Sequence, residues 1–148
     1  MSTALLDTNV LVHAAYSGSH LHRIASRLVE VGLRDRGRFC IAPQNIIEFA
    51  AVATHRRFVD PPLPPDDSER MAGLLYRSRR LAKIYPQRGT VRRAIEEGAA
   101  LGIHGTTWYD LFLAMTMRDA GIREIVTENV KDFRRFSFVT VRRIEDAE

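Results

Sequence analysis

The sequence is poor in cysteine and has no long apolar run. Its single cysteine, Cys40, lies in a short apolar stretch, so we expect a small buried thiol that forms no disulfide within the chain and has no catalytic role. The longest uninterrupted runs of hydrophobic residues contain five, whereas a membrane-spanning helix needs roughly 18. The first ten residues lack the basic and then apolar pattern of a secretory signal. We therefore expect a cytoplasmic protein.

Lysine is also scarce, because 20 of the 22 basic residues are arginines and only Lys83 and Lys131 are lysines. With 18 acidic residues, the formal net charge is +4. The forked guanidinium group suits phosphate, which fits a nucleic-acid partner. A general bias of composition towards arginine explains the same count, because net charge describes association and not fold. Charge alone therefore leaves both interpretations open.

Length and composition indicate one globular domain. The chain has 148 residues, of which 45% are hydrophobic and 27% are charged, close to the averages for soluble domains. A chain of this length buries enough surface for one sizeable core and too little for two. We expect a single domain that spans residues 1–148.

Short apolar segments alternate with helical patterns along the chain. We expect strands at residues 4–6, 39–42, 84–85, 125–126 and 138–141. Helices are expected to begin at Thr8 or Asn9, after Ser19, at Pro43, near Asp66, before Val91 and at Thr106 or Thr107. This alternation predicts an α/β fold with a mostly parallel sheet that helices cover on both faces.

The middle of the chain has its own local pattern. Four of the six prolines lie within residues 61–65, where they predict a stiff extended connector. Asp66 and Glu69 then have the spacing of a capping box, which predicts the start of a helix. Helical periodicity continues to Leu81 and Ala82, so we expect the helix to reach these residues.

Four acidic residues follow apolar strands or open the helices after them. Asp7 ends the first strand, Glu48 lies one turn into the helix after the second, and Asp110 opens the last long helix. Asp132 lies in a loop after the strand at 125–126. Each alone is explained as a helix N-cap, a first-turn acid or a solvated residue. In open parallel sheets, however, sites lie beyond the carboxyl ends of the strands, where these four acids would converge.

Such a cluster of acids predicts a metal site. Converging carboxylates repel one another unless a cation neutralises them, and oxygen ligands alone favour Mg²⁺ or Mn²⁺. The five histidines show neither zinc-site spacing with cysteine nor an HExxH pattern, which argues against zinc. One or two hard ions suit phosphodiester hydrolysis, because they activate water and stabilise the attacking and leaving oxygens.

Four segments carry a family resemblance: LLDTNVLVHA, PQNIIEF, TTWYDLFLAM and IVTENVKDF. Together they resemble the PIN-domain ribonucleases, and among these the VapC-type toxins of toxin–antitoxin pairs. The likeness runs from Leu5 to about Val141. It implies a three-layer α/β/α sandwich and endonucleolytic cleavage of RNA that depends on Mg²⁺ or Mn²⁺. It also implies a homodimer and a cognate antitoxin that inhibits the enzyme.

The resemblance assigns roles to particular residues. Asp7, Glu48 and Asp110 match the first three acids of the family, which implies that they are catalytic and hold the metal. Asn9 and Thr127 match its supporting polar residues.

The fourth acid departs from the common pattern. The family often has aspartate two residues after the motif threonine, whereas this chain has Asn129 there and Asp132 three residues later. We keep Asp132 as the fourth catalytic and metal-binding acid, and Asn129 as a supporting residue or ligand.

Basic residues near these motifs are candidates for contacting the RNA backbone, although solvated surface explains them equally well. They are Arg77, Arg79, Arg80, Lys83, Arg134 and Arg135.

Two other functions remain open. A PIN-like module that binds RNA or a protein without cleavage is consistent with Asn129, where an acid is common. A phosphatase with Asp7 as its covalent nucleophile also begins with a strand followed by aspartate. Such phosphatases need a second acid two residues later, where this chain has Asn9.

Overall fold

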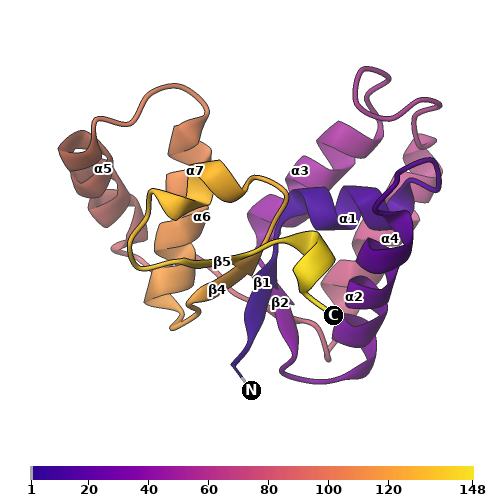
Figure 1. Cartoon of the computed structure of the whole chain (residues 1–148), viewed down its shortest axis with the longest axis horizontal. Coiled ribbons are helices and arrows are strands. Elements are labelled where there is room, and N and C mark those ends of the chain that lie inside the picture. Colours follow the sequence, from indigo (N-terminus) through magenta and orange to yellow (C-terminus); the bar gives the residue numbers. More distant parts are fainter. Residues whose placement is uncertain (1) are drawn as a thin grey trace.

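Five parallel strands form the central sheet of the computed structural model, which describes residues 2–148 (Figure 1). The strands are β1 (Ala4–Leu6), β2 (Phe39–Ile41), β3 (Ala82–Lys83), β4 (Glu124–Val126) and β5 (Thr140–Arg142). Their order in the sheet is β3-β2-β1-β4-β5, and every neighbouring pair is parallel. The predicted α/β fold with a parallel sheet is confirmed.

Within residues 2–148, seven α-helices and one short 3₁₀ helix accompany the strands. They are α1 (Thr8–Ala15), α2 (His22–Arg34), α3 (Pro43–Ala53), α4 (Pro65–Arg77), α5 (Thr90–Leu101), α6 (Thr107–Asp119), α7 (Val130–Arg134) and the 3₁₀ helix Ile144–Asp146. In this part of the chain, no helix combines the length and the apolar character needed to cross a membrane.

Alternate side chains of the strands supply two separate cores, one on each face of the sheet. In β1, Ala4 and Leu6 belong to the core that α1, α2, α3 and α4 cover, and Leu5 belongs to the core beneath α5, α6 and α7. A strand buried on both faces is a continuous apolar run, as β1 and β2 are. Cys40 of β2 is fully buried, and burial raises the pKa of its thiol to about 12. The three-layer sandwich and the buried thiol are confirmed.

The start of α4 differs from the prediction. Pro65 is its first residue, and Pro64, which has no polar side chain, occupies the N-cap position. Proline fits the first helical position because its φ is already helical and it has no N–H to leave unpaired. The predicted capping box of Asp66 and Glu69 is therefore wrong.

The end of α4 also differs, because the helix stops at Arg77. Ser78 is extended, and its hydroxyl oxygen accepts hydrogen bonds from the backbone N–H groups of Arg80 (3.3 Å) and Leu81 (3.2 Å). These local bonds form a turn in place of another helical turn. Leu81 is consequently buried in the connection, and Ala82 begins β3.

Two further elements were misplaced by the sequence pattern. The strand predicted at 84–85 lies two residues earlier, at Ala82–Lys83, where the backbone pairs with β2. The loop expected after β4 contains α7, and Asp132 lies in the first turn of this helix. Burial of Phe133 in the core shared with α6 explains why a helix forms here.

The start of α6 is anchored by close packing on α5. A Cβ at Gly98 would come within 2.3 Å of the indole ring of Trp108. Glycine inside a helix costs about 0.5–1 kcal/mol relative to alanine, and this close approach is the reason for its presence. Packing of Trp108 on α5 holds the first turn of α6, which carries Asp110.

Candidate active site

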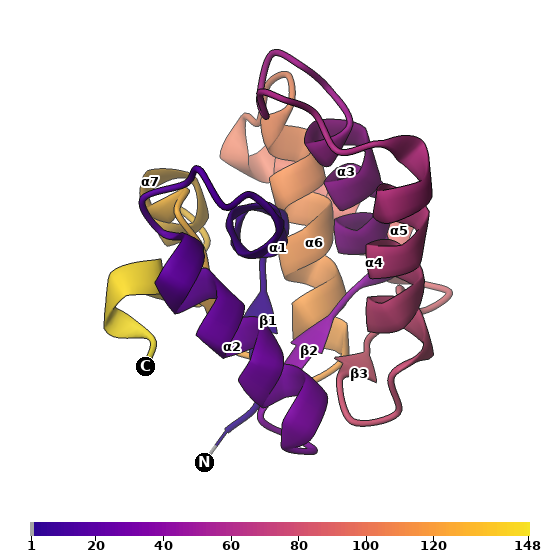
Figure 2. The ribbon, with the colours of Figure 1, turned by 90° about the vertical axis from the view of Figure 1, so that its right-hand side faces the viewer.

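Asp7 lies directly beyond the carboxyl end of β1 and precedes α1. Figure 2 shows α1 at this end of the strand. Its backbone is extended, and its Oδ1 accepts a hydrogen bond of 2.8 Å from the backbone N–H of Thr8. Asp7 is therefore the N-cap residue, and Thr8 is the first residue of α1. Because the cap continues the strand, its carboxylate emerges at the end of the sheet where the neighbouring strands also end.

The second oxygen of Asp7 is held by two side chains from different elements. Thr127, just after β4, donates its hydroxyl to Oδ2 at 2.7 Å, and Asn9 donates its amide to the same oxygen at 3.3 Å. Asp7 is only 6% exposed. Burial raises the pKa of Asp7 to about 6, although the hydrogen bonds from Thr127, Thr8 and Asn9 oppose this effect.

Glu48 projects from α3 and is fixed at both carboxylate oxygens. The Thr8 hydroxyl donates to Oε2 at 2.9 Å, and the Gln44 amide donates to Oε1 at 2.9 Å. Gln44 also donates to the backbone carbonyl of Tyr109 at 3.1 Å, which connects α3 to the first turn of α6. Glu48 is thus held in one orientation beside Asp7.

Thr8, Gln44 and Asn45 also support this part of the site, and none of them was among the residues predicted for it. The Asn45 amide donates to the Thr8 hydroxyl at 3.2 Å, while its carbonyl oxygen accepts from the backbone N–H of Ala42 at 2.9 Å. The spacing of Gln44 and Glu48, four residues apart on a helix, was a usable signal for one of these contacts. The others join segments that only the fold brings together.

Asp110 lies in the first turn of α6 and faces the other acids across the end of the sheet. Burial raises its pKa to about 7, and the negative charges of Asp7, Asp132 and Glu48 contribute in that order. The other three predicted acids are therefore close enough for their charges to raise the pKa of Asp110.

Residues 127–129 form a turn that links β4 to α1. The Thr127 hydroxyl oxygen accepts from the Asn9 amide at 3.1 Å and from the backbone N–H of Asn129 at 3.0 Å. The Asn9 carbonyl oxygen accepts from the backbone N–H of Glu128 at 3.1 Å. Both supporting residues, Asn9 and Thr127, thus position Asp7 and the turn that carries Asn129.

His13 and Glu128 also border the site, and sequence analysis did not assign either of them. His13 Nε2 lies 2.8 Å from Glu128 Oε2, and its Nδ1 lies 2.5 Å from Ser19 Oγ. Because the backbone N–H of Leu21 already donates to Ser19 Oγ, the hydroxyl proton is available for Nδ1, and Nε2–H then donates to Glu128. This pair holds the Glu128 carboxylate beside α1.

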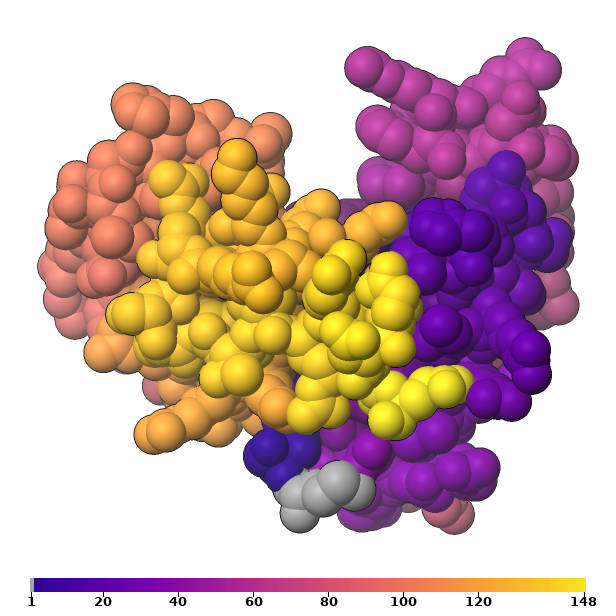
Figure 3. Space-filling model, in the orientation of Figure 1, coloured from indigo at the N-terminus to yellow at the C-terminus, as the bar shows by residue number. Residues whose placement is uncertain are grey.

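These groups surround an open cleft of about 330 Å³ at the carboxyl end of the sheet. Its lining consists of Asp7, Thr8, Asn9, Val12, His13, Glu48, Val52, Phe58, Asp110, Glu128 and Asn129. Figure 3 shows the surface hollowed at the top of the view, between the part that contains α5 and the part that contains α3. Three predicted acids and two predicted supporting residues therefore share one cleft.

Asp132 does not line this cleft. It borders an adjacent hollow of about 490 Å³, which shares Glu128 and Asn129 with the cleft and is also lined by Lys131 and Arg134. Its charge nevertheless contributes to the raised pKa of Asp110. Asn129 thus lies at the boundary of the two hollows, with Asp132 on the far side.

The donor set of the cleft fits a hard divalent cation. Asp7, Glu48 and Asp110 offer carboxylate oxygens, the ligands that Mg²⁺ and Mn²⁺ prefer, and a cation would offset the repulsion that raises the pKa of Asp110. Within residues 2–148, no three carboxylate, imidazole or thiol groups are close enough to enclose an ion by themselves. An ion bound here would therefore retain water ligands, as Mg²⁺ usually does.

The basic candidates fall into two groups. Arg134 borders the hollow beside the cleft, and Arg135 follows it at the end of α7. Arg77, Arg79 and Arg80 instead precede β3 and lie at the amino end of the sheet, away from the cleft.

Lys83 is occupied by the chain itself. Its ammonium group donates to the backbone carbonyl oxygens of Leu75 (3.3 Å), Leu81 (2.6 Å) and Ser78. These bonds satisfy carbonyl groups at the end of α4 and in the turn that follows it, so Lys83 has a structural role in this turn.

Solved structures share this fold at low sequence identity. The chain is similar to a chain of VapBC-1 from nontypeable Haemophilus influenzae, with a TM-score of 0.65, 20% identity and coverage of 97% of this chain and 98% of that chain. It is similar to VapC20 of Mycobacterium tuberculosis, with a TM-score of 0.63, 15% identity and coverage of 84% and 87%. A chain of VapBC2 from Rickettsia felis gives a TM-score of 0.64, 16% identity and coverage of 95% and 98%.

A family model matches directly at the level of sequence. No curated protein sequence matches the chain. The family model for the PIN domain matches residues 4–139, which include all four acids and cover most of the chain. The protein therefore belongs to the PIN-domain family.

Proposed function

We propose that this protein is an endoribonuclease that hydrolyses RNA phosphodiester bonds with Mg²⁺ or Mn²⁺. The observation that carries the proposal is the convergence of Asp7, Glu48 and Asp110 in one cleft, with raised pKa values for Asp7 and Asp110. Groups with strongly perturbed pKa values in a cleft are typical of functional sites. The charge of Asp132 also raises the pKa of Asp110, so all four predicted acids act at this site. This supports a nuclease in preference to a module that binds RNA or protein without cleavage.

Asp7, Glu48 and Asp110 would hold the metal, with Asp132 and Asn129 at its edge. When bound, the ion supplies an activated water and stabilises charge on the reacting phosphate. The protein contributes the fixed orientation of the acids, because Thr127 and Asn9 hold Asp7 and separate donors hold Glu48. Such supporting hydrogen bonds are worth about 10–100-fold in metal affinity or activity.

The similar structures support a toxin role. VapC20 of Mycobacterium tuberculosis is described as a toxin that cleaves the sarcin–ricin loop, and another similar structure is a toxin–antitoxin complex from Klebsiella pneumoniae. We propose that this chain is likewise the toxin of a pair and has a cognate antitoxin. Arg134 and Arg135, beside the cleft, are the proposed contacts for the RNA backbone at the site.

Metal removal tests the nuclease function directly. End-labelled RNAs, both structured and unstructured, are incubated with the purified protein and Mg²⁺ or Mn²⁺, and the products are resolved on a gel. We expect discrete cleavage products that disappear in EDTA and return when excess metal is added. Cleavage that persists in EDTA after removal of contaminating nuclease would contradict the assigned metal chemistry.

A homodimer is proposed from an apolar surface on α5. Val91 and Ile95, one turn apart on α5, are 54% and 58% exposed. Exposed apolar patches of this kind on a soluble domain are typical of protein interfaces. A second copy of the chain would cover them.

Size-exclusion chromatography with light scattering measures the oligomeric state of the protein. The wild-type protein is expected at about twice the chain mass of 16.8 kDa, and the Ile95→Glu variant at the monomer mass, because a charge would be placed in the interface. Glu96→Gln, on the adjacent position of α5, is the matched control and should remain dimeric. A monomeric wild-type protein rejects the dimer.

A further inference from the structure

A group of arginines occupies the end of the sheet opposite the cleft. The segments that lead into β2 and β3 enter the sheet at its amino end, and each carries three arginines within a few residues. We call these residues the amino-end arginines: Arg34, Arg36, Arg38, Arg77, Arg79 and Arg80. Three of them were candidates for RNA contact from sequence alone, and the structure adds the three that precede β2.

The two segments lie side by side. The Arg80 guanidinium donates a hydrogen bond of 2.7 Å to the backbone carbonyl oxygen of Arg34, and β2 pairs directly with β3. The hydrogen bond from Arg34 holds the pKa of Asp35 below its ordinary value, and the charges of Arg34, Arg38 and Arg80 add to this effect. Guanidinium groups from both segments therefore converge around one carboxylate.

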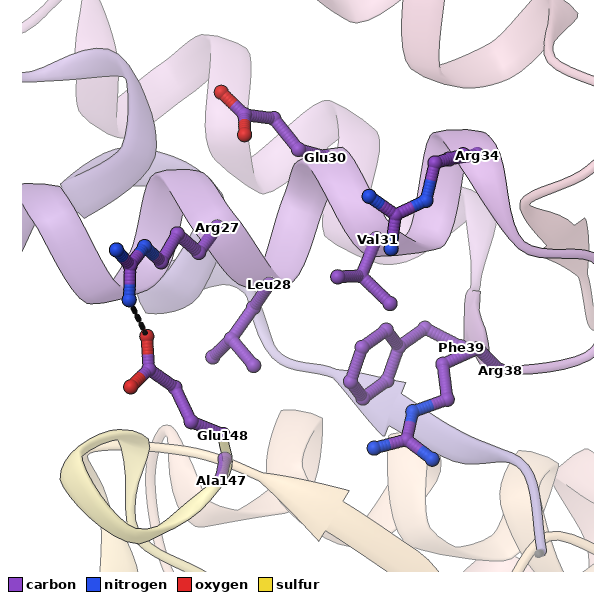
Figure 4. A pocket seen from close by; sticks show the side chains of 9 residues that line it. All are labelled: Arg27, Leu28, Glu30, Val31, Arg34, Arg38, Phe39, Ala147 and Glu148. Carbon is purple, nitrogen blue, oxygen red and sulfur yellow. Dashed lines mark hydrogen bonds and ion pairs between the residues drawn. The ribbon is translucent and has the colours of Figure 1, made fainter.

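A surface hollow of about 470 Å³ begins at this group. Arg34 and Arg38 lie on opposite sides of it with Phe39 between them, as Figure 4 shows. The Arg38 guanidinium lies 5.7 Å from the centre of the Phe39 ring. The hollow has an apolar floor, and the acids Glu30 and Glu148 share its rim with the arginines.

The segments that lead into β2 and β3 carry charge opposite in sign to that of the cleft. Asp35 is the single acid within residues 34–38 and 77–80, and it is already paired with Arg34. Every amino-end arginine except Arg38 is exposed. The cleft at the other end is lined by four carboxylates. A polyanion is therefore repelled by the cleft in the absence of metal and attracted by the amino end.

On the basis of the proposed nuclease function, we propose that the amino-end arginines form a second RNA-binding surface that holds the phosphate backbone of a folded substrate. Arginine forks bind phosphate in pairs of hydrogen bonds, and such contacts supply affinity that does not depend on sequence. The surface anchors a structured RNA while a single-stranded part of the same molecule reaches the cleft. A short unstructured RNA occupies the cleft alone.

RNA binding without cleavage tests this surface. A fluorescein-labelled RNA stem–loop is titrated in EDTA at several salt concentrations, and fluorescence anisotropy gives the dissociation constant. The Arg36→Gln/Arg79→Gln variant is compared with Arg23→Gln/Arg70→Gln, which removes the same charge from exposed positions on α2 and α4. All four side chains are exposed, so both variants are expected to fold.

The first variant should bind more weakly and lose about 0.7 to 0.9 of the log–log salt slope for each arginine, while the control keeps the wild-type slope. Equal losses in both variants, or no RNA binding by the wild-type protein, would overturn the proposal. Competition by polyglutamate as effective as that by unlabelled stem–loop would also overturn it, in favour of an acidic protein partner.

Cleavage of a short unstructured RNA separates this proposal from the nuclease function. The Arg36→Gln/Arg79→Gln variant should cleave it at the wild-type rate with Mn²⁺, because this substrate does not reach the amino end. A protein that binds the stem–loop through these arginines but cleaves no RNA would retain the surface and reject the nuclease. A protein that cleaves RNA, but whose binding of the stem–loop does not depend on these arginines, would retain the nuclease function and reject the surface.

Discussion

Replacing Asp7 with Asn is expected to reduce RNA cleavage by at least about 10³-fold while the protein stays folded. A catalytic metal supplies several kcal/mol of transition-state stabilisation, and each 1.36 kcal/mol corresponds to about tenfold in rate. The variant removes the charge of the most buried acid in the cleft. Asparagine is also a good N-cap, so the bond to Thr8 and the start of α1 should persist. Rates from end-labelled RNA and a thermal unfolding curve measure both effects.

The matched control is Asp66→Asn, which makes the same change in the first turn of α4. Asp66 is exposed and does not line the cleft, so cleavage should remain at the wild-type rate. Full activity of Asp7→Asn would show that this carboxylate is not part of the chemistry. Loss of activity together with loss of the cooperative unfolding transition would instead indicate a structural role.

In EDTA, the protein is expected to lose stability as the pH rises from about 4 to about 7. The unfolded chain releases the Asp7 proton at the ordinary pKa of 3.8, whereas the folded protein holds it to about pH 6 and holds that of Asp110 to about pH 7. Between these values the folded state binds more protons, so the free energy of unfolding falls with rising pH. For Asp7, a shift of about two pKa units corresponds to about 3 kcal/mol. Urea unfolding at several pH values measures this.

Addition of Mn²⁺ or Mg²⁺ should reverse this loss, because a cation bound to the folded state offsets the repulsion between the acids. Stabilisation is about 2.7 kcal/mol when the free ion is at 100 times its dissociation constant. The Asp7→Asn variant should show a flatter pH dependence and a smaller response to metal, whereas Asp66→Asn should match the wild-type protein. Stability that is constant over this range and indifferent to metal would contradict a shared acid site.

Local sequence patterns predicted the elements that carry the acids. An apolar strand at 4–6 followed by Asp7 predicts a strand and a helix cap, and Pro43 predicts the start of the helix that carries Glu48. These predictions succeed because capping and periodicity depend on residues only a few positions apart. They failed at α4, where Ser78 bonds to the turn and ends a helix that periodicity extends to Leu81.

The contacts that make a site of these residues could not be predicted in the same way. Thr127 donates to Asp7 across 120 positions of sequence, and Thr8 donates to Glu48 across 40. The order of the strands decides these contacts, because β1 lies between β2 and β4 and their following segments meet at one end. The raised pKa of Asp110 has the same origin, since it depends on burial and on charges from three other elements.

The sequence alone therefore determined the alternation of strands and helices, the acids that follow them and the resemblance to PIN-domain ribonucleases. Only the tertiary structure decided which polar groups fix those acids, that Asp132 borders a neighbouring hollow, and that Arg77, Arg79 and Arg80 lie far from the cleft. The physical reason is the distance along the sequence over which the interactions act. Secondary structure follows from interactions within a few residues, whereas a site and a charged surface form where distant segments are packed together by the sheet.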